Sequence, residues 1–192
     1  MIAFQETLAY TPQYGSLATL ADEPSGLTCS VIVGRRWAHN RAASVVGYPR
    51  FELAAERVLA GDHDLLLVPS AYPDIREFFF NPELRAIDTF LSTLPDMVLA
   101  VPAGGDADGG EFDVLYHHPA TKSLVEALPH RVGEVRASTS NSAACKEAVE
   151  HPGRACAVTN RIAADGYGMT IARTLSAGTP MGFVVFARKE SS

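Results

Sequence analysis

The chain has 192 residues, which suits one domain or two small lobes and is too short for several independent domains. Hydrophobic residues make up 47% of it and charged residues 20%, a composition that favours a folded globular protein and excludes wholesale disorder. The formal net charge is −6 and the 16 lysines and arginines form no block, which argues against a nucleic-acid or anionic-membrane surface. No apolar run approaches the roughly 18 residues of a membrane span, and the first residues do not resemble a secretory signal.

The cysteines and histidines predict neither disulfides nor a metal site. Cys29, Cys145 and Cys156 are odd in number and lack C-x-x-C spacing, which indicates reduced thiols in a cytoplasmic protein. His117 and His118 are adjacent, so they are poorly placed to chelate one ion, and no third ligand has suitable spacing. The G-x-S-x-G, P-loop and G-x-G-x-x-G motifs are absent, so no cofactor is expected.

In the first half of the chain, apolar runs alternate with segments of helical periodicity. Gly61 follows the clearest of these segments and predicts its end. In chain order we expect a strand at Thr28–Val33, a helix at Asn40–Val46, a helix at Phe51–Ala60, a strand at Asp64–Val68, a helical turn at Asp74–Phe80, and strands at Ile87–Leu91 and Met97–Val101.

The second half repeats this alternation. Pro119 stands at the first position of one expected helix, where proline is favoured. In chain order we expect a strand at Phe112–Tyr116, a helix at Pro119–Leu128, a strand at Val132–Ala137, a helix at Ser140–Glu150, a strand at Ala155–Thr159, a short helix at Arg161–Asp165, and strands at Thr170–Leu175 and Phe183–Ala187.

Such alternation predicts an α/β fold with a largely parallel sheet. In such folds a ligand binds at the carboxyl ends of strands, near helix N-termini. Four of the expected strand-to-helix junctions are rich in polar groups, and these are Arg35–Asn40, Ser70–Tyr72, Ser138–Ser142 and Thr159–Arg161.

These junctions offer several groups that could bind a small anion. The Ser138–Ser142 junction leaves free N–H groups at a positive helix end, which suits a carboxylate, although Ser140 could simply be an N-cap. Arg35 and Arg36 have the fork geometry that carboxylates prefer, or they are solvated surface charges. His118, before the Pro119 helix, could hydrogen-bond a ligand or supply a proton.

A set of short motifs, in a particular order and spacing, resembles the catalytic domain of prephenate dehydratases. The likeness covers most of residues 28–187 and includes the segment from Phe51 to Pro69. The motifs are Tyr116-His117-His118-Pro119, Ser138-Thr139 with Ala143-Ala144, Ala155 with Asn160, and Ala163-Ala164 with Tyr167-Gly168-Met169.

Three departures from that pattern resemble the prephenate decarboxylases of bacilysin-type biosynthesis. The dehydratase Pro-Ile-Glu-Asn-Ser stands here as Pro69–Pro73, and the Thr-Arg-Phe whose threonine assists loss of the ring hydroxyl stands as Met181–Phe183. The dehydratase Gly-Thr-Phe-Ser is matched to Arg36–His39. Met181 and Gly182 carry no protic side chain, so the acid that drives aromatisation is missing.

The resemblance implies non-aromatising decarboxylation of prephenate to a dihydro-4-hydroxyphenylpyruvate in secondary metabolism, such as antibiotic biosynthesis. It implies a two-lobed fold like that of prephenate dehydratases and type 2 periplasmic binding proteins, with the active site in the cleft and a homodimer as the assembly. The lobes are expected to comprise residues 1–90 plus 170–192, and residues 91–169.

The resemblance also suggests roles for individual residues. Ser138, Thr139 and Ser140 would hold the pyruvyl carboxylate and Asn160 would hydrogen-bond beside them. The proton donor stays open among His39, His118 and Tyr72, and His39 could instead only cap a helix that begins at Asn40. Arg35 or Arg36 would anchor a carboxylate from the other lobe, and the remaining expected contacts are Ser70, Ala71 and Met181.

Two other functions remain open at this point. A divergent prephenate dehydratase would make phenylpyruvate, and the pair Met181-Gly182 argues against it. A non-catalytic module would use the cleft to sense a small acid, and it would not consume prephenate.

Overall fold

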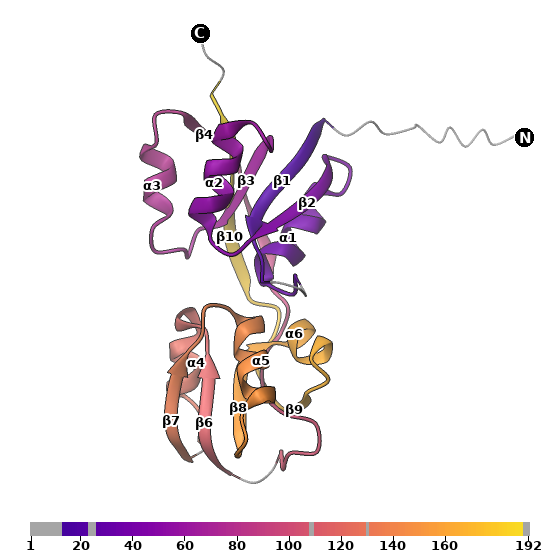
Figure 1. Cartoon of the computed structure of the whole chain (residues 1–192), viewed down its shortest axis with the longest axis vertical. Coiled ribbons are helices and arrows are strands. Elements are labelled where there is room, and N and C mark those ends of the chain that lie inside the picture. The colour runs from indigo at the N-terminus through magenta and orange to yellow at the C-terminus, as the bar shows by residue number, and fades with distance from the viewer. Residues whose placement is uncertain (1–12, 23–25, 108–109, 130, 190–192) are drawn as a thin grey trace, which may run out of the picture.

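The computed structural model describes residues 13–22, 26–107, 110–129 and 131–189 of the chain. They form two five-stranded sheets, each with helices on both faces, and the two units lie one above the other (Figure 1). Lobe 1 is built on the sheet β2-β1-β3-β10-β4 and lobe 2 on the sheet β7-β6-β8-β5-β9. No helix in these ranges is long and apolar enough to cross a bilayer. The predicted two-lobed α/β fold is confirmed.

Lobe 1 contains the first four strands, three helices and the last strand. Its elements are β1 (Tyr14–Leu20), α1 (Cys29–Ala38), β2 (Ala42–Tyr48), α2 (Phe51–Ala60), β3 (Leu65–Pro69), α3 (Ile75–Phe80), β4 (Leu84–Thr93) and β10 (Pro180–Arg188).

Lobe 2 contains the elements between β4 and β10. They are β5 (Met97–Val101), β6 (Glu111–His117), a 3-10 turn at Pro119–Thr121, α4 (Lys122–Glu126), β7 (Arg131–Ala137), α5 (Asn141–Glu150), β8 (Ala155–Asn160), α6 (Arg161–Gly166) and β9 (Thr170–Ser176).

Helices cover both faces of each sheet and bury the core. In lobe 1, α2 and α3 pack on one face through Phe51 and Phe78, and α1 packs on the other through Trp37. In lobe 2, α5 and α6 cover one face, and α4 covers the other through Leu124. The helices thereby bury an apolar core on both faces of each sheet, whereas the edge strand β7 stays largely exposed.

Two elements near the start of the chain differ from the prediction. Residues expected to form the strand Thr28–Val33 belong to α1, because Val31, Gly34 and Ala38 repeat at helical spacing on its buried side and Thr28 caps it by accepting from the Val31 N–H. The expected helix at Asn40–Val46 is strand β2, which pairs in parallel with β1, itself not predicted.

Each sheet is mixed rather than largely parallel. In lobe 1, β1 pairs in parallel with β2 and β3, whereas β10 is antiparallel to both β3 and β4. In lobe 2, β6 pairs in parallel with β7 and β8, whereas β5 is antiparallel to both β8 and β9. The antiparallel strands arise because the chain crosses between lobes twice, after β4 and after β9. The predicted lobe boundary at residue 170 is therefore wrong, since β9 pairs in lobe 2.

Candidate active site

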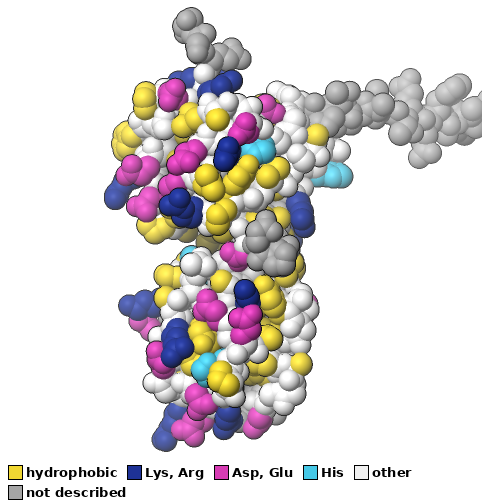
Figure 2. All heavy atoms as spheres, in the orientation of Figure 1, with side chains coloured by type: hydrophobic (Ala, Val, Ile, Leu, Met, Phe, Trp, Pro, Cys, Tyr) yellow, Lys and Arg dark blue, Asp and Glu magenta, His cyan; other side chains and the backbone are white. Residues whose placement is uncertain are grey.

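A cavity of about 480 Å³ lies between the two lobes, at their waist (Figure 2). It sits at the carboxyl ends of β1, β2 and β3 in lobe 1 and of β6 and β7 in lobe 2. Its volume suits a small organic molecule. The lining residues are Leu20, Pro49, Arg50, Phe51, Glu52 and Tyr72 from lobe 1, and His118, Pro119, Ala137, Ser138 and Thr139 from lobe 2.

The start of α2 brings a cation and free backbone N–H groups to this cavity. Arg50 is the N-cap residue, its backbone is extended, and no side chain caps the helix. The first N–H groups of a helix have no partner within it, and they carry the positive end of the helix dipole. Because Arg50 and the first turn of α2 both line the cavity, this wall suits a carboxylate.

Tyr72 and Glu52 form a hydrogen-bonded pair on the same wall. The Tyr72 hydroxyl donates to Glu52 Oε1, and the ring of Tyr72 packs against Phe51 with centroids 4.8 Å apart. Burial, followed by the bond and the charge of Glu52, raises the pKa of Tyr72 above its usual range. Tyr72 therefore holds its proton firmly and directs it to Glu52.

His118 faces the cavity from lobe 2, where it caps the turn at Pro119. Its Nδ1 accepts from the Ala120 N–H at 3.2 Å. Burial, followed by the neighbouring His117, lowers the pKa of His118, while Asp22 acts in the opposite direction. With Nδ1 used as an acceptor, the neutral ring carries its hydrogen on Nε2.

The predicted carboxylate site at Ser138–Ser142 is divided between two roles. Thr139 is exposed in the cavity, whereas the buried Ser138 donates its hydroxyl to Glu147 at 2.8 Å. Ser140 caps α5 by accepting from the Ala143 N–H at 2.9 Å.

A carboxylate of the chain itself binds at the start of α5. Both Ser140 and Ser142 donate their hydroxyls to Asp22 Oδ2, which comes from lobe 1. Ser140 is therefore a cap and a lobe-to-lobe contact, and it is not among the residues that line the cavity.

Asn160, also a predicted substrate contact, serves the same kind of structural role. Its side chain is fully buried, its Oδ1 caps α6 by accepting from the Ala163 N–H, and its Nδ2 donates to the Leu27 carbonyl of lobe 1. Asn160 therefore fastens α6 and the Leu27 segment, and it does not line the cavity.

The structure does not bring His39 to the cavity. His39 is the C-cap of α1, so the hypothesis that it caps a helix beginning at Asn40 is wrong. The next residues lead into β2, and the Arg41 carbonyl bonds the N–H of Tyr14 at the amino end of β1. The cavity lies at the carboxyl end of β1, about 20 Å away along a strand of this length. The proposed match of Arg36–His39 to a motif beside the substrate fails for the same reason.

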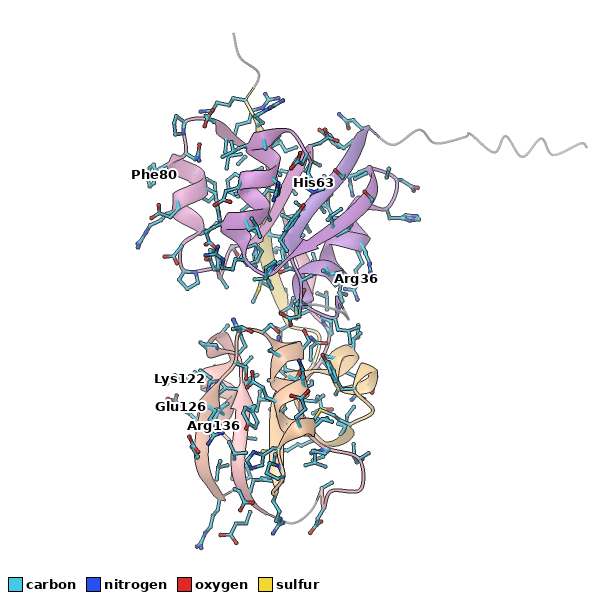
Figure 3. All side chains as sticks on the ribbon, in the orientation of Figure 1. Arg36, His63, Phe80, Lys122, Glu126 and Arg136 are labelled. Atoms are coloured by element: carbon cyan, nitrogen blue, oxygen red, sulfur yellow. The ribbon has the colours of Figure 1, made fainter. Side chains whose placement is uncertain are left out.

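The two predicted arginine anchors lie outside the cavity lining as well. Arg36 donates to the Thr93 carbonyl at 2.7 Å, at the connection between the lobes (Figure 3). The Arg35 guanidinium folds back to Gly26. Both belong to the last turn of α1, because their segment is helical rather than a strand-to-helix junction.

The remaining predicted contacts lie outside the cavity lining. Ser70 donates its hydroxyl to the Gly182 carbonyl at 3.0 Å, and Ala71 is exposed before Tyr72. Met181 is partly buried against the core formed with Trp37 and its neighbours. None of the three is among the residues that line the cavity.

Sequence reasoning missed Arg50, Glu52 and Asp22. The sequence predicts the helix at Phe51–Ala60, but it does not predict a strand-to-helix junction at its start, because the pattern over Asn40–Val46 favours a helix there. A signal was available, since a helix preceded by Pro49-Arg50 lacks the Ser, Thr, Asp or Asn that usually caps a first turn. Asp22 has no local signal, because its partners lie far away in sequence. Among the described residues, no three His, Cys, Asp or Glu side chains are grouped as a metal ion would need.

Comparisons with known proteins place the chain among relatives of one enzyme. The chain is 28% identical to a prephenate decarboxylase of Bacillus subtilis over 142 residues, which is 73% of this chain and 69% of that protein. A prephenate decarboxylase of Bacillus amyloliquefaciens matches with the same identity and coverage. No protein-family model matches the chain.

Solved structures establish the fold. A prephenate dehydratase of Arthrobacter aurescens, crystallised with L-Phe, superposes with a TM-score of 0.70 at 17% identity, covering 92% of this chain. This chain spans 61% of that dehydratase chain. The Staphylococcus aureus prephenate dehydratase gives a TM-score of 0.67 at 13% identity, and a periplasmic substrate-binding protein of Coxiella burnetii gives 0.52 at 12%. The chain therefore has the two-lobed fold of the prephenate dehydratases and is a sequence relative of the prephenate decarboxylases.

Proposed function

We propose that this chain is a carboxy-lyase that decarboxylates prephenate without aromatising it, giving a dihydro-4-hydroxyphenylpyruvate. The observation that carries the proposal is the interlobe cavity, in which Arg50 and the open start of α2 lie beside the Glu52–Tyr72 pair, and whose lining also has apolar residues from both lobes. The relatives named prephenate decarboxylase supply the substrate.

The reaction breaks one carbon–carbon bond. The bond between the ring and its carboxylate breaks, CO₂ leaves, and the electron pair shifts through the diene to a ring carbon that takes a proton. The ring hydroxyl stays in place. No electrons are gained or lost overall and the proton comes from solvent through a side chain, so we propose that neither a metal nor an organic cofactor takes part.

Arg50 and the first N–H groups of α2 anchor the pyruvyl carboxylate, which keeps its charge throughout. The same cation beside the ring carboxylate would stabilise the reactant more than the transition state, because that charge disappears as CO₂ forms. The ring carboxylate is therefore placed against uncharged residues such as Leu20, Pro119 and Ala137. Exclusion of water from this side favours its loss.

Glu52 delivers the proton and Tyr72 holds its carboxyl group in place. Tyr72 is a poor acid because its pKa is raised, and its hydrogen is already donated to Glu52. His118 is neutral near pH 7 because its pKa is lowered, so it donates an Nε2 hydrogen bond to an uncharged substrate oxygen rather than a proton. In this proposal Glu52 relays a solvent proton to the ring carbon, and a well-placed acid contributes about 10²–10⁴-fold.

Retention of the ring hydroxyl requires that the acid of the cavity faces the ring carbon and not the hydroxyl. In this proposal Glu52, held by Tyr72, is turned to the ring carbon, and the hydroxyl faces lobe 2, where His118 lies. Neutral His118 is too weak an acid to protonate a leaving hydroxide. A divergent dehydratase would need a stronger acid facing the hydroxyl.

The wider setting is part of the same proposal. The three free thiols, two of them buried, suit a reducing compartment, so we place the protein in the cytoplasm. Its product would feed the biosynthesis of a non-aromatic tyrosine analogue of the kind found in bacilysin, and the assembly would be a homodimer without nucleic-acid partners.

The test is to incubate purified protein with prephenate and follow the product by ultraviolet absorption and mass, with a protein-free control for spontaneous aromatisation. The proposal expects a product that has lost CO₂ and kept the hydroxyl, at a rate that a chelator does not change. Phenylpyruvate above the control would identify a dehydratase instead. Binding without consumption of prephenate would identify a sensing module.

A further inference from the structure

The carboxylate of Asp22 lies across the lobe boundary at the start of α5. We propose that Asp22 is a positioning residue: it fills the anion-binding start of α5 and so keeps the substrate's carboxylates off lobe 2. The kinetic part of this inference rests on the proposed decarboxylation, whereas the occupancy of the helix start does not.

The start of α5 is built to bind a carboxylate. Ser142 is fully buried, Ser140 is 4% exposed, and both donate their hydroxyls to the same oxygen of Asp22. The helix has ten residues, so its first turn carries a positive partial charge that an anion complements. A substrate carboxylate and Asp22 cannot occupy these donors together.

Neighbouring contacts hold the Asp22 segment against lobe 2. The Leu27 side chain packs into the lobe 2 core, where a Cβ on Gly166 would lie 2.3 Å from its Cδ1. The Leu27 carbonyl accepts from Asn160 at 3.2 Å, and Cys29 Sγ accepts from Asn141 at 3.7 Å. In all these hydrogen bonds lobe 1 supplies the acceptor and lobe 2 the donor.

Decarboxylation explains why the site should be filled. A positive helix end beside the ring carboxylate would stabilise the charged reactant. That stabilisation disappears as neutral CO₂ leaves, so the helix end would slow the reaction. Asp22 cancels that positive end with a charge the protein keeps. It also lies close enough to His118 to act on its pKa, which places it near the lobe 2 wall of the cavity.

Thermal melting with added formate tests whether Asp22 fills the start of α5, and it needs no assay of prephenate. In Asp22→Ala the donors are vacant, and formate at about five times its Kd should raise Tm by roughly 2–4 °C. Wild type and the surface variant Asp62→Ala should show no such rise. The double variant Asp22→Ala/Ser142→Ala, which lacks a donor, should respond less. Absence of a formate-dependent rise in Asp22→Ala would overturn the proposal.

Steady-state kinetics of Asp22→Asn test the consequence for decarboxylation. Asparagine keeps the shape and can still accept from both serines, so the fold is preserved. The proposal expects kcat and KM to fall together, by roughly 2- to 30-fold, because the reactant binds too well at the uncancelled helix end. A raised KM with unchanged kcat would show that Asp22 only fastens the lobes and would overturn its positioning role. If wild type consumed no prephenate, the proposed function would fail, and the melting result would still decide the occupancy.

Discussion

The two lobes share one plan, and they differ most where their second helices begin. In lobe 1, β2 leads into α2 at Arg50, and in lobe 2, β7 leads into α5 at Ser140. Both helices have ten residues and both starts lie close to the cavity. The start of α2 has no side-chain cap, whereas the start of α5 is capped by its own serine and bound to a carboxylate from the other lobe.

This difference teaches that a helix start cannot be assigned to a ligand from its sequence alone. The serine-rich start of α5 has the more obvious sequence signal, but the protein itself occupies it. The start of α2 has a poor capping sequence, and it is open to the cavity. We expect charge recognition and proton delivery in lobe 1, and uncharged contacts in lobe 2.

The largest expected effect comes from Glu52→Gln, which removes the proposed acid from lobe 1. Glutamine can still accept from Tyr72, so the fold should be kept while kcat falls about 10²–10⁴-fold. Single-turnover measurements on prephenate check this, with Glu56→Gln, one turn further along the exposed side of α2, as the control. A kcat within about twofold of wild type would remove Glu52 from the chemistry.

Arg50→Gln tests the open helix start. Loss of the charge-assisted hydrogen bonds to the pyruvyl carboxylate should cost about 1.5–3 kcal/mol, or roughly 10- to 150-fold in kcat/KM, expressed mainly in KM. Arg57→Gln is the matched control, because Arg57 lies in the last turn of the same helix and pairs with Asp62 on the surface. Equal values of kcat/KM for the two variants would contradict the role of Arg50 as the anchor of the pyruvyl carboxylate.

Thr139→Val distinguishes a charged partner from a neutral one in lobe 2. If Thr139 contacts an uncharged substrate oxygen, catalytic efficiency should fall only about 2- to 10-fold. If it holds a carboxylate, as the sequence alone suggested, the loss should reach roughly 10- to 150-fold. A loss clearly beyond about 10-fold would break the contrast between the lobes. Thr170→Val, at another exposed threonine of lobe 2, controls for the substitution itself.

Met181→Thr should change stability and not chemistry. The side chain packs against the core around Trp37, so a smaller, polar residue there should cost about 1–3 kcal/mol of unfolding free energy. For a chain of this size that lowers Tm by roughly 2–4 °C per kcal/mol. The fraction of phenylpyruvate should stay unchanged. A rise in that fraction would place Met181 beside the ring after all, as the sequence comparison with dehydratases predicted.

The smallest effect concerns the pH dependence of stability through His118. Its pKa in the folded protein is lowered from the ordinary value of 6.5, so the unfolded chain binds the proton first as pH falls. The contribution of neutral His118 to stability is therefore complete above pH 6.5, and it is lost as pH falls towards the lower pKa of the folded protein. Urea unfolding at about pH 7.5 and about pH 5.5 should show that wild type loses more unfolding free energy between the two than His118→Gln does. Equal losses of unfolding free energy in the two proteins would contradict the lowered pKa of His118.

The sequence predicted most of lobe 2 and less of lobe 1. Elements such as β5, α5 and β8 are confirmed within a residue or two because their apolar periodicity is clear. The segment from Cys29 to Tyr48 was predicted with helix and strand exchanged, because β-branched residues occur in α1 and small residues in the edge strand β2.

The exchange of helix and strand in this segment also explains part of the difference between the predicted site and the cavity. Tyr72, His118, Ser138 and Thr139 were named from the sequence and line the cavity. His39, Arg35 and Arg36 do not line the cavity, because the β-branched start of α1 predicts a strand that ends before them, whereas the segment is helical. Ser140 and Asn160 have the chemistry of ligands, but contacts with Asp22 and Leu27, more than 100 residues away, occupy them. Such long-range pairing leaves no trace in a local motif.

The most direct test of the account is a crystal structure of the protein with an unreactive dicarboxylate analogue of prephenate. The account predicts one carboxylate bound to Arg50 and the first N–H groups of α2, with Asp22 still on Ser140 and Ser142. A carboxylate of the analogue bound at the start of α5, with Asp22 displaced, would contradict it.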